Sequence, residues 1–125
     1  MILDALSWSR RCTRKTIDPN LSQIESQKKI CVLIGSRANY SSIKNVLYEL
    51  KKNKKTKLFI IAFSSALLDK FGKVSEIIKK DGFKIDEEIY NHLDGETPLT
   101  MSKSTGLAII ELSSILSKHK PDIVL

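Results

Sequence analysis

Two cysteines among 125 residues are too few for a disulfide framework, and no cluster of metal ligands accompanies them. Cys31 lies inside an apolar run, so we expect it to pack as a small apolar side chain. No apolar run approaches the roughly 20 residues that a membrane-spanning helix requires. The N-terminus also lacks the uninterrupted apolar segment of a secretory signal. We therefore expect a cytoplasmic protein that does not interact with membranes.

The sequence also lacks both common phosphate-binding motifs, GxGxxG and the P-loop, and it shows no nucleophile–base pair. Its two histidines stand far apart. We expect His119 to complement the negative end of a helix, whereas His92, in a predicted loop, is open to an acid or base role. The acidic residues Asp94 and Glu96 lie in a predicted turn and are expected to face water. The sequence thus predicts no cofactor, no metal site and no complete catalytic set.

Acidic residues are the minority charge: 14 Asp and Glu stand against 21 Lys and Arg, a net charge of +7. Such an excess raises the question of an anionic partner. Five of the seven residues 51–57 are lysine, which could hold phosphates without sequence preference. No aromatic residues are interleaved to stack on bases, so a solvated helix end is the favoured interpretation. We therefore expect no binding to nucleic acid.

The most informative stretch is residues 29–50. Ile30–Ile34 is an unbroken apolar run, typical of a strand buried on both faces of a parallel sheet. Gly35 ends it, and residues 36–41 form a polar loop. Apolar residues then recur with helical spacing, at Ile43, Val46, Leu47 and Leu50. Strand, glycine turn and helix form the opening unit of an α/β nucleotide-binding fold, with the loop at the ligand edge of the sheet.

The same alternation continues along the chain. The further elements that we expect are a strand at 58–63, a helical segment at 66–81 broken near Gly72 and stopped by Gly82, a short strand at 83–86 leading into an acidic segment, a helix at about 100–119, and a strand at 122–125. A glycine inside the last helix, Gly106, could permit close approach of another backbone or a ligand. Strands that alternate with helices predict an α/β fold with a Rossmann-like parallel sheet and flanking helices.

Residues 1–28 have no sustained periodicity. Their basic residues give them a faint similarity to a transit peptide, but a flexible N-terminal extension is the favoured interpretation. We expect the Rossmann-like domain to occupy residues 29–125. A length of 125 residues corresponds to about one domain, and it does not accommodate two full α/β domains.

The loop after the first strand is the candidate binding site. Arg37 supplies a cation, and the start of the following helix supplies free N–H groups and a partial positive charge. Hydroxyl groups surround them, on Ser36, Tyr40, Ser41 and Ser42. An anion such as diphosphate could be held there. In the alternative interpretation, Arg37 is an ordinary surface cation and Ser41 or Ser42 caps the helix.

Four stretches, in order and in register, resemble the UDP-N-acetylglucosamine 2-epimerases, especially their hydrolysing, sialic-acid-pathway branch. They are KICVLIGSRANY at 29–40, LLDKFG at 67–72, GETP with MSKSTGLA at 95–108, and KPDIVL at 120–125. The resemblance implies that the chain is part of the first half of a two-domain, GT-B-type fold with its active site between the domains. It also implies a UDP-sugar ligand contacted by Arg37 and Ser41, and a homo-oligomer in the full-length family.

The family reaction implied by this resemblance releases UDP from UDP-N-acetylglucosamine and then adds water, yielding N-acetylmannosamine. The chain departs from the family pattern at two positions, with Asn39 in place of an acid and Ala66 in place of a histidine. The Asp-Arg pair expected after Leu125 is absent. We therefore expect this chain alone to have no epimerase activity and, with part of its sheet uncovered, to self-associate. The alternative is a non-catalytic α/β domain that binds a nucleotide or a partner protein.

Overall fold

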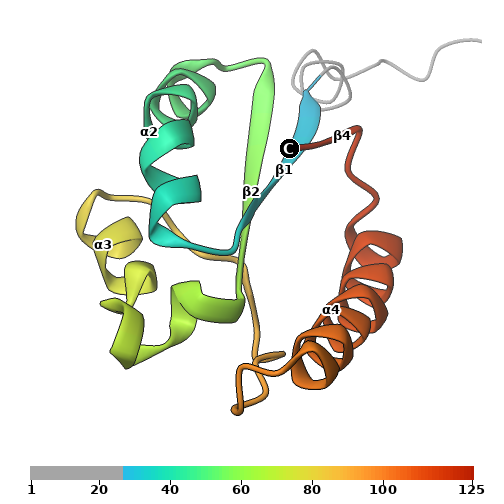
Figure 1. The fold of residues 1–125 in the computed structure, drawn as a ribbon. Helices are drawn as coiled ribbons and strands as arrows, with labels where there is room; N and C mark the ends of the chain where they lie inside the picture. Colours follow the sequence, from blue (N-terminus) through green and yellow to red (C-terminus); the bar gives the residue numbers. More distant parts are fainter. Residues whose placement is uncertain (1–26) are drawn as a thin grey trace, which may run out of the picture.

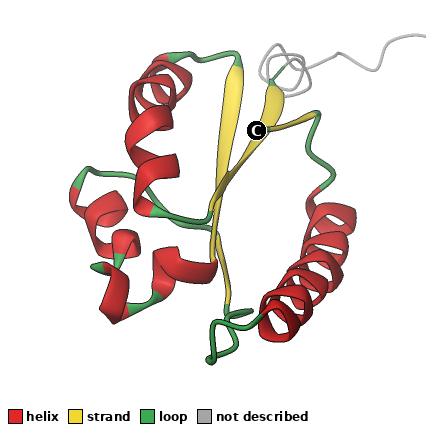
Figure 2. Cartoon of the chain, in the orientation of Figure 1, coloured by secondary structure: helices red, strands yellow, loops and turns green. Residues whose placement is uncertain are grey.

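The computed structural model describes residues 27–125, and this part of the chain forms a four-stranded parallel sheet between two helical layers (Figures 1 and 2). The elements are β1 (Lys28–Ile34), α2 (Arg37–Lys52), β2 (Thr56–Phe63), the 3₁₀ turns η1 (Ser64–Leu67) and η2 (Asp69–Phe71), α3 (Val74–Lys80), β3 (Glu87–Ile89), α4 (Pro98–His119) and β4 (Ile123–Val124). The predicted α/β class and parallel sheet are confirmed. The predicted extension, residues 1–28, lies almost entirely outside the described residues.

The strand order β3-β2-β1-β4 places the direction change of the sheet at β1. From β1 the chain builds outward through β2 to β3, then crosses over to add β4 on the other side of β1. Figure 1 shows the consequence: α2 and α3 cover one face, and α4 covers the other. In such sheets the crevice beside the carboxyl ends of the strands, where the order reverses, is the usual ligand site. The turn after β1 lies at that point.

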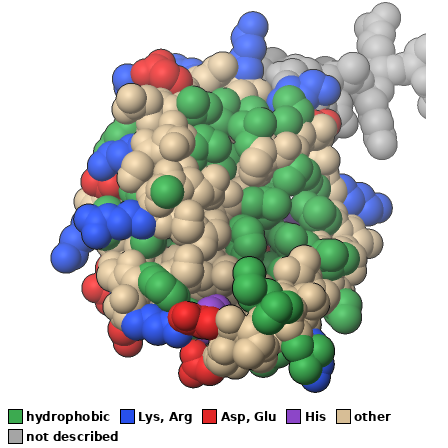
Figure 3. All heavy atoms as spheres, in the orientation of Figure 1, with side chains coloured by type: hydrophobic (Ala, Val, Ile, Leu, Met, Phe, Trp, Pro, Cys, Tyr) green, Lys and Arg blue, Asp and Glu red, His purple; other side chains and the backbone are tan. Residues whose placement is uncertain are grey.

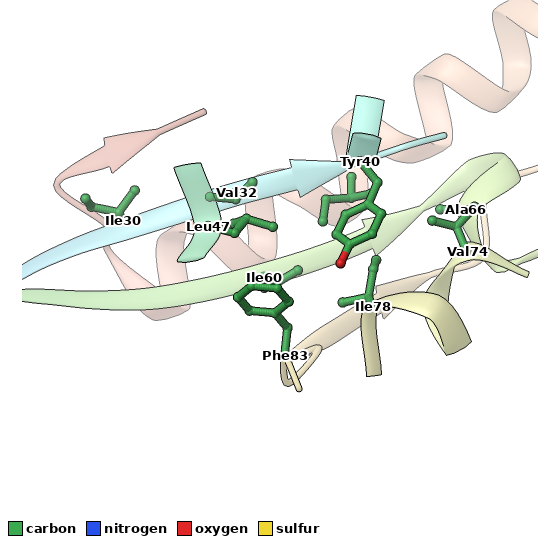
Figure 4. Packing of buried hydrophobic residues seen from close by; sticks show 10 residues of the cluster. Ile30, Val32, Tyr40, Leu47, Ile60, Ala66, Val74, Ile78 and Phe83 are labelled. Carbon is green, nitrogen blue, oxygen red and sulfur yellow. The ribbon is translucent and has the colours of Figure 1, made fainter. Parts of the chain in front are cut away.

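Both faces of β1 and β2 are buried, which explains their unbroken apolar sequences. Alternate residues of β1, such as Val32, point into the core under α2 and α3, where Tyr40, Leu47 and Ile78 gather (Figure 4). The other residues of β1 point into a smaller core under α4. Cys31 is fully buried there, as predicted, and its burial raises the thiol pKa to about 11, with a smaller contribution from the charge of Asp86. It is therefore a packing residue and not a nucleophile.

The predicted position of the third strand is wrong: β3 is Glu87–Ile89 and not residues 83–86. Phe83 is instead buried in the core under α2 and α3. Asp86, just before β3, lies beside the middle of β2, where its side chain accepts a hydrogen bond from the Ile60 N–H at 3.0 Å. Glu87 and Glu88, the acidic residues that follow, are tolerated in a strand because each forms an ion pair with a lysine. Lys118 lies 3.1 Å from Glu87, and Lys79 lies 3.1 Å from Glu88.

No described backbone makes the close approach to Gly106 that its position suggested, and the approach of a ligand there stays a prediction. Within residues 27–125, no atom lies within 4 Å of the place that a Cβ would occupy. The outer side of α4 is instead an exposed apolar surface that includes Leu99, Ile109 and Ile110, and Figure 3 shows hydrophobic side chains concentrated over this part of the molecule. None of the helices in the described part of the chain is long and apolar enough to cross a membrane.

Candidate functional site

The turn between β1 and α2 is held by a small set of hydrogen bonds. Helix α2 begins at Arg37, and Ser36 is its N-cap: the Ser36 hydroxyl accepts from the Asn39 N–H at 3.2 Å. The Asn39 side chain accepts in return from the Gly35 N–H at 3.2 Å. The expected loop at 36–41 is therefore mostly helix, and the expected cap at Ser41 or Ser42 is wrong. Because Ser36 caps the helix, Arg37 lies in its first turn.

Gly35 is required by its neighbour on β2. A Cβ at this position would lie 2.8 Å from Cζ of Phe63, closer than atoms can pack. The Gly35 carbonyl also accepts hydrogen bonds from the Ser65 hydroxyl at 2.8 Å and from the Ala66 N–H at 3.2 Å. The ends of β1 and β2 are thus joined into one rigid rim that carries the candidate site.

Arg37 and Ser41 are both exposed at this rim. They are four residues apart on α2, so their side chains lie on the same side of the helix. The first turn of α2 contains no acidic residue, and a guanidinium nitrogen of Arg37 lies 3.8 Å from the place that a Cβ on Gly72 would occupy. The structure therefore places this cation and hydroxyl together at the carboxyl edge of the sheet, beside the helix N-terminus.

Three other hydroxyl groups of the candidate loop already have partners. Ser36 caps the helix, and the Ser42 hydroxyl donates to the Ala38 carbonyl at 3.0 Å. Tyr40 is buried, and its hydroxyl donates to Oδ2 of Asp81 at 2.6 Å. These three hydroxyl groups organise the turn and its packing, while Arg37 and Ser41, the two predicted contacts of the ligand, face outward.

The contact at Asp81 ties α2 to the end of α3. Oδ2 of Asp81 lies 2.6 Å from Nζ of Lys44 as well as from the Tyr40 hydroxyl. The hydrogen bonds from Lys44 and then Tyr40 lower the pKa of Asp81. Burial, followed by the hydrogen bond to Asp81, raises the pKa of Tyr40 well above its usual value. Tyr40 therefore stays protonated as a donor, and the helix carrying Arg37 is fixed against its neighbour.

A cavity of about 620 Å³ opens at the same edge of the sheet, between the ends of β2 and β3 and the first half of α4. Phe63 and Ser64 line its β2 side, and Ser104 and Thr105 line its α4 side. A cavity of this volume is large enough for a small organic ligand. It begins at Phe63, the residue whose ring lies against Gly35, so it adjoins the turn that carries Arg37.

Asn91 builds this cavity, and sequence analysis did not identify it. Its side chain is buried; Oδ1 accepts from the Ser64 N–H at 2.9 Å, and Nδ2 donates to the Ser104 carbonyl at 3.0 Å. One amide thus joins the end of β2 to α4. The partners lie 27 and 13 residues away, so no local pattern marks this asparagine as special.

His92 also lines the cavity. Its Nε2 is buried without a hydrogen-bond partner in the described part of the chain, although Oδ1 of Asp94 lies 3.7 Å away. Its ring meets that of Phe71 edge-on, with 6.3 Å between the centroids. This nitrogen has almost no accessible surface, so a ligand group in the cavity could reach it only after the ring turns. The structure thus places His92, which the sequence left as a candidate acid or base, at the wall of this cavity.

His119 does not take part in this site. It is the last residue of α4, as predicted, and its Nε2 lies 3.0 Å from Oε1 of Glu87. Among residues 27–125, no group of three or more His, Cys, Asp or Glu residues is placed to hold a metal ion. Chemically, the edge combines one cation, a helix N-terminus and a polar cavity, an arrangement suited to binding an anion that carries a further polar group.

Comparisons with known proteins give consistent relatives. No protein-family model matches the chain. Over 99 residues it is 32% identical to GDP/UDP-N,N'-diacetylbacillosamine 2-epimerase (hydrolyzing) of Campylobacter jejuni, a match that covers 79% of this chain and 26% of that protein. Its fold is similar to a crystal structure of UDP-N-acetylglucosamine 2-epimerase, with a TM-score of 0.64, 19% identity, and coverage of 78% of this chain and 26% of the other.

A second solved structure, of a Listeria monocytogenes protein given the same enzyme name, also has a TM-score of 0.64, with 13% identity over 78% of this chain and 24% of the other. At these identities the two structures show a shared fold alone. The chain spans about a quarter of the length of the relatives it matches. The predicted resemblance to the UDP-N-acetylglucosamine 2-epimerases and to their hydrolysing branch is confirmed, whereas the sialic-acid pathway stays a prediction.

Proposed function

We propose that the exposed carboxyl edge of this chain binds the diphosphate of a UDP-sugar, because the chain resembles an N-terminal portion of the UDP-N-acetylglucosamine 2-epimerases and has a hydrolysing enzyme among its relatives. The whole protein would then release UDP from UDP-N-acetylglucosamine and form N-acetylmannosamine, for sialic-acid-type sugars. One observation carries the proposal: Arg37 stands exposed at the start of α2, at the point where the strand order reverses.

In this proposal Arg37 and Ser41 hold the phosphates. Loss of UDP places negative charge on the leaving diphosphate, and a fixed cation beside it stabilises that charge. The N–H groups at the start of α2 add to the same effect. The adjoining cavity, which His92 lines, receives the sugar. The Campylobacter relative is named for a different sugar, so the nucleotide diphosphate is the part of the ligand that we propose with most support.

Binding is proposed for this chain, and turnover is not. Asn39, which stands in place of a family acid, uses its side chain to accept the Gly35 N–H. Ala66, in place of a histidine, is fully buried and its N–H donates to the same glycine. Neither position brings an acid or base within hydrogen-bond reach of a ligand at Arg37, and acid–base catalysis requires that reach.

Titration of the chain with UDP, followed by calorimetry, tests this proposal. We expect Arg37→Ala to weaken UDP binding by about tenfold or more, the effect of losing a charge-assisted contact. Lys52→Ala is the matched control, since it removes a cation from the other end of the same helix. Equal affinity of wild type and Arg37→Ala would refute the proposal. A coupled assay for N-acetylmannosamine should show no product above background.

A non-catalytic nucleotide-binding domain is the second candidate, and the lack of a suitably placed acid and base at positions 39 and 66 favours it. The two readings differ in selectivity. A domain that recognises only phosphates through Arg37 and the α2 N-terminus would bind ADP as tightly as UDP. An epimerase portion would retain a preference for UDP-sugars over ADP, so the same titration with ADP and UDP-N-acetylglucosamine separates the two candidates.

A further inference from the structure

A second cavity, of about 240 Å³, lies at the opposite edge of the sheet, where the strands begin and α4 ends. In Figure 1 this edge is at the top, near the start of β1 and the end of α4. Three lysines line the cavity, Lys29, Lys57 and Lys84, and Asp86 is the one carboxylate among its lining residues. The cavity is therefore positively charged, and it is separate from the carboxyl edge that carries Arg37.

The lysines come together because of the register of the sheet. Lys29 of β1 and Lys57 of β2 are direct partners across the two strands. Strand alternation places both side chains on the α4 face, the face of Cys31 and Phe59. Two like charges directly opposite each other destabilise a sheet. The arrangement therefore has an energetic cost that a bound anion would offset.

Within the described residues, the charges around the cavity are only partly neutralised. Nζ of Lys84 lies 3.2 Å from Oδ1 of Asp86. Nζ of Lys29 donates to the His119 carbonyl at 3.2 Å, at the negative end of α4. Lys57 forms no ion pair with any described carboxylate. At least one full positive charge thus faces the cavity without a partner.

The wall beside these cations is aromatic and held in place. The rings of Phe59 and His119 stack with 4.2 Å between their centroids. Glu87 holds His119 from behind, with Oε1 3.0 Å from Nε2, and also accepts from Lys118 at 3.1 Å. An aromatic wall, made of two rings tilted by 36°, therefore lies next to the cations, which suits a ligand that joins an anionic group to an apolar or aromatic body.

We propose that this cavity binds a small molecule carrying a phosphate group. Lysine ammonium groups act as point charges toward phosphate oxygens, and the cavity is large enough for an organic group beside the phosphate. The site goes beyond the proposed UDP-sugar function because it uses none of the residues at the carboxyl edge. A polynucleotide is not favoured, since the lysine-rich segment 51–57 lacks the interleaved aromatic residues that stack on successive bases.

Backbone amide NMR on the full chain, at fixed ionic strength, tests the proposal with inorganic phosphate and phenyl phosphate as probes. We expect shifts centred on Lys57 and Phe59, and about tenfold tighter binding of phenyl phosphate, because its ring would lie on the aromatic wall. Lys57→Ser should weaken phenyl phosphate binding by about tenfold. Lys54→Ser is the matched control from the same lysine-rich segment, outside the cavity lining, and should leave the affinity within about twofold.

Other outcomes would overturn the proposal. Absence of shifts at this edge would do so, and equal weakening by the two lysine substitutions would indicate diffuse attraction rather than a site. Tighter binding of a thymidine oligonucleotide than of phenyl phosphate would indicate a polyanion surface. Loss of phenyl phosphate binding in Arg37→Ala would place the probe at the carboxyl edge. Unchanged binding in that variant supports a separate site, whether or not UDP binds at Arg37.

Discussion

Replacement of Asn91 by alanine is the sharpest test of how the candidate cavity is built. The substitution removes the acceptor for the Ser64 N–H and the donor to the Ser104 carbonyl, at a position that is 5% exposed. Each polar group left unpaired in a buried place costs about 1–3 kcal/mol. Only the Ser64 N–H is then left without a partner, because the Ser104 carbonyl lies inside α4 and still accepts a helical hydrogen bond, so we expect a loss of about 1–3 kcal/mol in the free energy of unfolding. Such a loss is readily measured against the roughly 5–15 kcal/mol typical of a domain.

Urea denaturation followed by circular dichroism measures this loss. Asn91→Asp keeps an acceptor for the Ser64 N–H but places a buried carboxylate oxygen against the Ser104 carbonyl, so near pH 7 it should be no more stable than Asn91→Ala. Asn45→Ala, on the exposed side of α2, is the control and should change the stability by less than about 0.5 kcal/mol. If Asn91→Ala were as stable as Asn45→Ala, the bridge between β2 and α4 would not carry the role assigned to it.

Three further predictions concern the rim, the pH response and the outer surface. Gly35→Ala should lower the free energy of unfolding by about 1–3 kcal/mol because the new methyl group meets Phe63. Gly106→Ala, in an open helical position, should instead raise the free energy of unfolding by up to about 1 kcal/mol. Thermal melts of both variants measure these changes, and equal effects would contradict the prediction. Asp81 has a lowered pKa in the folded chain, so its contribution to stability is present above about pH 4 and is lost as the pH falls through the pKa of the folded state. Asp81→Asn should therefore flatten the pH dependence of the melting temperature between about pH 2 and pH 6. Ile110 is exposed on α4, so Ile110→Ser should reduce self-association in light scattering, and a monomeric wild type would refute that expectation.

Local sequence predicted β1 and β2 well because both strands are buried on two faces. Burial on two faces requires apolar residues at consecutive positions, a signal that is legible within six or seven residues. The third strand was misplaced because its acidic residues are neutralised by Lys79 and Lys118. Lys118 lies 31 residues from Glu87, and its contribution depends on how α4 packs. Cations that arrive from elsewhere in the fold cannot be read from the strand itself.

In the candidate site, too, some features could be predicted from the sequence and others could not. The position of Arg37 at the ligand edge follows from chain order alone, because a residue after a parallel strand lies at the carboxyl edge. The roles of Tyr40 and Asn91 do not follow from chain order. Tyr40 was predicted to lie in a polar loop, yet it is part of α2 and its hydroxyl bonds to Asp81, 41 residues away.

The amino-acid sequence by itself determined the class of fold, the alternation of strands and helices, and the edge of the sheet at which Arg37 lies. These depend on apolar periodicity and on chain order, which are local properties. Only the tertiary structure decided which polar side chains are hydrogen-bonded within the protein and which remain exposed, and only it formed the two cavities. Hydrogen bonds and ion pairs join residues that are distant in sequence, and their partners become neighbours only after the sheet and its two helical layers have packed together.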